Sequence, residues 1–135
     1  MGTIMEKKND ITTIADIQQL VDTFYGKVRE NPLIGPIFNG VIGDRWPEHL
    51  AKMYRFWQTV LFGEHTYFGS PFPPHAQLPV DRRHFDTWLG LWHGTIDQFF
   101  EGEKAAEAKW RGDKMAEMFL SKIDYFRNNQ SSPLL

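Results

Sequence analysis

His75 is the residue of this sequence whose surroundings point most directly to chemistry, because a histidine can bind a metal or exchange a proton. It lies in the proline-rich stretch SPFPPHAQLPV at residues 70–80. Proline fixes its own φ and disfavours the helical conformation in the residue before it, so this stretch is not a helix interior. A stiff, irregular segment that presents an imidazole is typical of a binding site, although an incidental loop histidine fits the same residues.

The other four histidines are weaker candidates for a functional role than His75. His49 falls on an apolar helical stripe, where a histidine is more often a core residue than part of a ligand pocket, and His65, His84 and His93 fit ordinary solvated side chains. No pair has the His-x-x-x-His spacing of a catalytic zinc site, and no Glu-x-x-His motif marks a di-iron bundle. The sequence also has no cysteine, phosphate-binding glycine loop or nucleophile elbow. A zinc site and a serine or cysteine nucleophile are therefore not supported.

Two polar aromatic side chains are expected to face inward. Tyr25 lies on the apolar face of the first predicted helix, and Trp88 lies on the apolar face of the third. A phenol O–H and an indole N–H are costly to bury without a hydrogen-bond partner. Together they suggest an internal acceptor, of which a gas ligand on a haem iron would be one.

Helices must position these side chains. Apolar residues recur at three- and four-residue spacings over 14–28, 46–61, 82–100 and about 105–127, which predicts a helix in each range. Thr12, Thr13 and Asp16 are expected to begin the first helix, Asp44 the second and Asp81 the third. The ends, residues 1–11 and 128–135, are predicted to be frayed tails.

Two connections between these helices are predicted to be irregular. Residues 30–44 are rich in Pro, Gly and Asn and indicate a loop with a short turn at most, whose apolar side chains dock onto the core. Residues 63–80 form a longer connection, and loops of that length are usually functional or disordered. Their aromatic and proline content, with few charges, argues against disorder.

The composition bounds the possible functions. The chain has 135 residues, enough for a single domain, and a formal net charge of -2, which does not favour nucleic acid or an anionic membrane. Aromatic residues make up 15% of it, which fits a core around a large flat group and, equally, a plain Phe-rich core. It shows no transmembrane span and no signal peptide, so a cytoplasmic location is the expectation.

Four motifs in this order resemble the third group of the truncated haemoglobins. They are FYGKVRENPLIGPIFN at 24–39, WPEHLAKMYRFW at 46–57, GSPFPPHAQLP at 69–79 and FDTWLGLW at 85–92. The resemblance spans about Ile14 to Phe126 and implies an all-α fold, a two-on-two helical sandwich around haem b. A much reduced proximal helix is characteristic of this group, which would explain why the prolines surround His75.

The resemblance also implies roles for individual residues. His75 matches the proximal iron ligand, while His49, Tyr25 and Trp88 match the distal residues that face the bound gas. Phe38 matches the phenylalanine that packs against the haem, and Lys52 matches a position that meets a haem propionate. The pocket walls are expected to include Phe24, Met53, Phe56, Leu78 and Phe85.

The expected function is binding of O2 and other diatomic ligands such as NO and CO at a five-coordinate haem. Several distal donors would slow the release of O2, so chemistry on O2, NO or peroxide is expected rather than bulk transport. Nitric oxide dioxygenase-like or peroxidase-like turnover would need an external reductase and stays open. The alternative is a haem-free helical module for sensing or interaction, in which the aromatic stripes are plain core.

Overall fold

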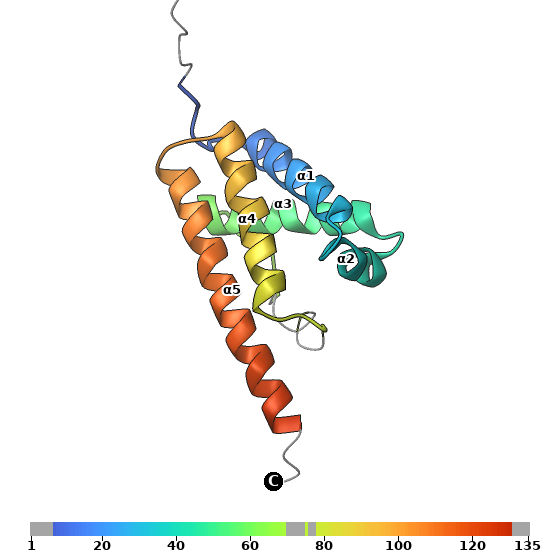
Figure 1. Cartoon of the computed structure of the whole chain (residues 1–135). Coiled ribbons are helices and arrows are strands. Elements are labelled where there is room, and N and C mark those ends of the chain that lie inside the picture. The colour runs from blue at the N-terminus through green and yellow to red at the C-terminus, as the bar shows by residue number, and fades with distance from the viewer. Residues whose placement is uncertain (1–6, 70–74, 76–77, 131–135) are drawn as a thin grey trace, which may run out of the picture.

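The computed structural model describes residues 7–69, 75 and 78–130, and over these residues the regular structure is α-helical (Figure 1). In chain order the helices are α1 (Ile14–Glu30), α2 (Gly35–Ile42), α3 (Trp46–Phe62), α4 (Arg82–Phe99) and α5 (Glu103–Gln130). The predicted all-α class is therefore confirmed. None of the described helices is long and apolar enough to cross a membrane.

Helices α4 and α5 lie side by side in opposite directions, and α1 packs against both α3 and α4 (Figure 1). Trp92 is at the centre of the resulting core. Its indole stacks on that of Trp57 with the ring centroids 4.6 Å apart, and its Nε1 donates a hydrogen bond of 3.0 Å to the Ala108 carbonyl. One side chain thus joins α3, α4 and α5.

Two of the predicted helix starts are confirmed by their hydrogen bonds. The Thr13 hydroxyl accepts from the Asp16 N–H at 3.1 Å, and the Asp16 carboxylate accepts from the Thr13 N–H at 3.1 Å, a reciprocal capping box. Asp81 begins α4 in the same way, with His84 as its partner: the Asp81 N–H donates to His84 Nδ1 at 3.0 Å. The prediction that Asp44 caps α3 is wrong, because Arg45 holds the cap position and no side chain bonds the helix start.

The prediction of a loop over residues 30–44 is also wrong, because α2 occupies its second half. Pro36 lies in the first turn of α2, where its missing N–H costs no hydrogen bond. Gly35 lies against the end of α1 so closely that a Cβ there would be 2.7 Å from the Arg29 carbonyl oxygen. The glycine and the proline therefore start a helix and pack it, rather than interrupt one. Among the described residues of the 63–80 connection none is α-helical, as predicted.

Part of each predicted frayed tail is ordered in the structure. Residues 9–11 are docked: Ile11 is fully buried, and the Asp10 carboxylate accepts hydrogen bonds from the N–H groups of Lys104 and Ala105 at 2.9 and 2.8 Å. Asp10 thereby caps α5, which the sequence could not reveal because the two segments are far apart in the chain. At the other end α5 continues to Gln130. Residues 1–6 and 131–135 lie outside the described part of the chain.

Gly112 on α5 allows the core tryptophans to approach this helix. A Cβ at this position would lie 2.8 Å from Cδ1 and 2.9 Å from Nε1 of Trp92. We expect Gly112→Ala to lower the free energy of unfolding by about 1–2 kcal/mol, since overpacking exceeds the gain in helix propensity. Gly94→Ala is the matched control on α4: its Cβ meets nothing within 4 Å, and it is expected to stabilise by about 0.4–1 kcal/mol. Urea unfolding of both variants measures the difference, and a neutral Gly112→Ala would contradict the close-packing account.

Candidate functional site

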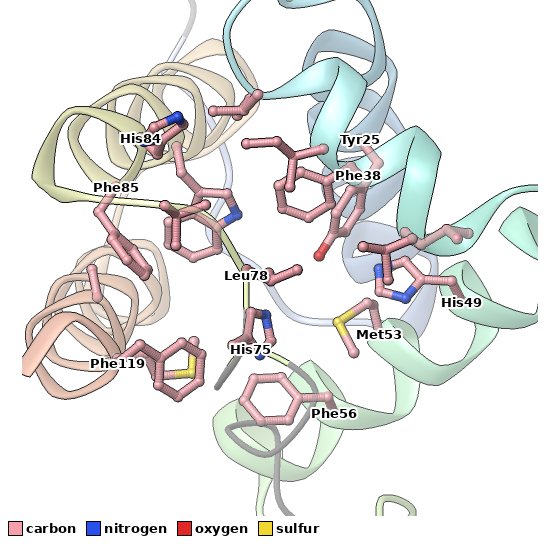
Figure 2. A pocket seen from close by; sticks show the side chains of 18 of the residues that line it. Tyr25, Phe38, His49, Met53, Phe56, His75, Leu78, His84, Phe85 and Phe119 are labelled. Atoms are coloured by element: carbon pink, nitrogen blue, oxygen red, sulfur yellow. The ribbon is translucent and has the colours of Figure 1, made fainter. Parts of the chain in front are cut away.

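An apolar cavity of about 210 Å³ lies between α1, α2, α3, α4, α5 and the segment that carries His75 (Figure 2). All the residues for which the resemblance implies a ligand, donor or propionate role line it, as do all but one of the predicted wall residues. Those lining it are Tyr25, Phe38, His49, Lys52, Met53, Phe56, His75, Leu78, Phe85 and Trp88. The structure thus brings together side chains that come from separate elements and are more than 60 residues apart in the sequence.

Tyr25 and His49 form the polar part of one wall. Tyr25 comes from the buried face of α1 and His49 from the first turn of α3, and their ring centroids are 5.0 Å apart at an interplanar angle of 86°. Trp46 backs both rings, at 5.7 Å from Tyr25 and 5.5 Å from His49. Figure 2 shows the Tyr25 hydroxyl turned into the cavity. Burial raises the pKa of this phenol, so it stays protonated and can donate a hydrogen bond.

His49 is neutral and has an unused ring nitrogen. Burial, with the nearby Lys52 and His75, lowers the pKa of His49 to about 4. Its Nε2 is buried and has no hydrogen-bond partner among the described residues. Because buried polar groups are nearly always satisfied, this orphaned nitrogen next to the cavity calls for a partner that the described residues do not supply, either a ligand or a water.

His75 approaches the cavity from the segment between α3 and α4. Its imidazole lies against the ring of Phe119 of α5, with the centroids 4.7 Å apart. In Figure 2 the His75 ring and the Tyr25 hydroxyl reach toward the same space from different elements, with Met53 and Phe56 of α3 beside them. The residues 70–74 and 76–77 next to His75, including the prolines from Pro71 to Pro74, lie outside the described part of the chain.

Trp88 adds an indole to the lining of the cavity. It comes from α4, where its indole stacks on that of Trp92 at 6.1 Å and 15° between the planes. Phe24 packs edge-on against Trp88 at 5.4 Å. Phe24, which was expected in the pocket wall, is 1% exposed, packs against Tyr25 and Trp88, and is not among the residues that line the cavity.

Several lining residues were not expected from the sequence. They are Ile34, Ile37, Val41, Ile42, Trp57, Tyr67, Val80, His84, Met115, Ala116 and Phe119. His84 was predicted to be solvated, but its side chain is 12% exposed and lines the cavity at the start of α4, where its Nδ1 accepts from the Asp81 N–H. Met115, Ala116 and Phe119 share the apolar face of α5, and the helical spacing gave no sign that this face closes a cavity. Their contribution is fixed by tertiary packing alone.

The chemistry of this wall fits a flat organic cofactor better than a bare metal ion. No group of three or more His, Cys, Asp or Glu side chains among the described residues could hold a metal ion. One imidazole that faces an apolar, aromatic-lined space can instead complete the coordination of a metal that arrives with its own ring of ligands. The orphaned His49 nitrogen and the Tyr25 hydroxyl would then face whatever binds beside that metal. The residues present therefore fit haem.

Comparisons with known proteins agree with this geometry. A family model described as bacterial-like globin matches residues 9–121. The chain is 36% identical over 111 residues to the group 3 truncated hemoglobin ctb of Campylobacter jejuni. The aligned region covers 79% of this chain and 87% of that protein. It is 32% identical over 93 residues to the group 2 truncated hemoglobin YjbI of Bacillus subtilis, which covers 64% and 67%.

Solved structures give the same result. The crystal structure of a group III truncated hemoglobin from Campylobacter jejuni matches with a TM-score of 0.79 at 32% identity, over 86% of this chain and 94% of that one. The X-ray structure of a truncated oxygen-avid haemoglobin from Bacillus subtilis matches with a TM-score of 0.69 at 28% identity, over 80% and 93%. The expected truncated-globin fold is thereby confirmed. The chain belongs to the bacterial-like globins, and within them to the group III truncated haemoglobins.

Proposed function

We propose that this protein binds haem b with His75 as the iron ligand, and binds O2, NO or CO on the side of Tyr25, His49 and Trp88. Haem binding in general follows from its membership of the truncated haemoglobins. The observation that carries the finer assignment is the pairing of His75 with an orphaned His49 nitrogen in one apolar cavity. Lys52 also lines this cavity, and we assign its ammonium to a haem propionate.

The cofactor supplies an iron that binds diatomic molecules. The protein's own residues supply polar groups on one side and mostly apolar side chains on the others. Tyr25 stays protonated because its phenol is buried, and Trp88 carries a fixed indole N–H, so both are hydrogen-bond donors at neutral pH. His49 stays neutral because its pKa is about 4, so it adds no positive charge to the pocket. Phe38, Phe56, Leu78 and Phe85 line the rest with carbon.

These donors favour retention of O2 and thus chemistry rather than transport. Hydrogen bonds to a ligand that carries partial negative charge contribute roughly 1.5–3 kcal/mol each. A ligand held this firmly is released slowly and is available for reaction with NO or with a reductant. Turnover of either kind requires electrons from an external reductase. Consumption of NO by the reduced protein faster than by free haem would support the NO reaction, and an equal rate would exclude it.

The absorption spectrum of the purified, haem-supplemented protein tests the binding proposal. We expect a Soret band in the ferric form, and a band in the ferrous form that shifts when CO is added. A six-coordinate ferrous spectrum before any gas is added would contradict an open distal side and would point to His49 as a second ligand. The absence of any Soret band after haem is supplied would refute haem binding and favour the alternative, a haem-free helical module.

A further inference from the structure

Helix α5 reaches the segment that carries His75 with its second half. Its first half is held against α4, where Trp92 donates to the Ala108 carbonyl at 3.0 Å and His93 bonds Asp113 at 2.8 Å. Its second half continues past the start of α4 and beyond the other helices (Figure 1). The second half of a helix whose first half is fixed to the core thus lies beside the segment of the assigned iron ligand.

Phe119 contacts the His75 imidazole directly. Its ring is 6% exposed, and its centroid lies 4.7 Å from that of the imidazole at an interplanar angle of 32°. Phe119 packs in turn with Ile123 and Val80 in a small core cluster that is separate from the main one. Because packed interiors leave side chains little room, a ring held in this cluster restricts rotation of the imidazole against it.

Arg127 fixes the backbone of the same segment. Its Nη2 donates to the Leu78 carbonyl at 2.9 Å, and the Leu78 N–H donates to the His75 carbonyl at 3.2 Å. A hydrogen-bonded connection therefore runs from α5 through Leu78 to the backbone of His75. The Arg127 side chain is exposed, so its replacement removes this link without opening the core.

We propose that α5 sets the orientation of the His75 imidazole, with Phe119 fixing the ring and Arg127 fixing the backbone that carries it. The inference rests on the proposed function, because it takes His75 as the haem ligand. Hydrogen-bond partners that orient a metal-bound histidine are worth about 10- to 100-fold in metal affinity or activity, and a packing contact or a backbone link is expected to contribute at the lower end of that range or below it. Phe119 and Arg127 are accordingly positioning residues, which determine how firmly haem is held and at what angle the imidazole meets the iron.

Two variants, each with a matched control, test this role. Arg127→Gln is compared with Arg111→Gln, another arginine of α5, whose guanidinium bonds Glu107 on the same helix at 3.3 Å. Phe119→Leu is compared with Phe100→Leu, a phenylalanine that is 5% exposed in the main core and does not line the cavity. The readouts are the iron–histidine stretching band of the ferrous protein by resonance Raman, and the rate of haem transfer to excess apomyoglobin.

Phe119→Leu is expected to shift the stretching band and to accelerate haem loss by about 10-fold. Arg127→Gln removes one exposed hydrogen bond and is expected to shift the band and to accelerate haem loss by about 2- to 10-fold. Both controls should keep the parent band and rate, even where Phe100→Leu lowers Tm. If both test variants kept the parent's stretching band and rate of haem loss, the inference would be overturned. If Phe119→Leu does not fold, the result for Arg127→Gln is sufficient to test it. A parent protein without a haem spectrum would instead refute the proposed function, and this inference with it.

Discussion

Replacing His75 with glycine is expected to weaken haem binding by at least about 100-fold, because loss of a metal ligand costs more than loss of the groups that orient it. The substitution leaves a space the size of an imidazole next to the cavity that His75 lines. Free imidazole in the buffer should enter this space and restore a parent-like Soret band. Haem titration followed by absorption, with and without imidazole, measures both effects.

Two further histidines serve as controls for the His75 experiment. His65 is exposed and His93 bonds Asp113 at 2.8 Å, and neither lines the cavity. Alanine at either position should leave haem affinity unchanged. If His75→Gly kept the parent affinity and spectrum and did not respond to imidazole, another residue would be the iron ligand, and His49 across the cavity would be the first to test.

Local rules predicted most of the helices because each rule acts within a few residues. Thr13 with Asp16, and Asp81 with His84, form their capping boxes inside one turn, and the apolar stripes of α1, α3 and α4 follow from helical spacing. The same rules misread residues 30–44, where Gly35 and Pro36 suggest a loop. Pro36 suits the first turn of α2, and the closeness of α1 explains Gly35, so tertiary contact decided that segment.

Distant contacts explain what the sequence could not predict. Asp10 caps α5 although more than 90 residues separate the hydrogen-bonded groups. Gly112 is a poor helix former in the middle of α5, yet it lies where the Trp92 indole needs space. Neither contact has a pattern that can be seen along the chain.

Only some residues of the candidate site could be predicted from the sequence, for a similar reason. Composition and spacing predicted that His75 belongs to a binding site and that Tyr25 and Trp88 face inward. The resemblance to a family added the roles of Phe38 and Lys52. The residues from α5, Met115 and Phe119, have no chemical signature of their own. Their apolar side chains are indistinguishable from ordinary core until the fold places them against the cavity and, for Phe119, against His75.

Replacing Tyr25 with phenylalanine is expected to accelerate the release of O2 by roughly 10- to 100-fold. The change removes only the buried hydroxyl that points into the cavity and keeps the ring that packs against Phe24 at 4.8 Å and His49 at 5.0 Å. A hydrogen bond to a charged partner contributes roughly 1.5–3 kcal/mol, and about 1.4 kcal/mol corresponds to a factor of ten. Stopped-flow displacement of O2 by CO measures the rate.

Tyr54→Phe is the control that separates loss of this one hydrogen bond from loss of any tyrosine hydroxyl. Tyr54 lies on α3, bonds Asp22 of α1 and does not line the cavity, so its removal should leave O2 release unchanged. An unchanged rate in Tyr25→Phe would mean that the phenol does not reach the ligand, and Trp88 would then be the remaining donor on that wall with a fixed proton. A large effect in Tyr25→Phe with none in Tyr54→Phe would instead assign the retention of O2 to the one hydroxyl that α1 directs inward.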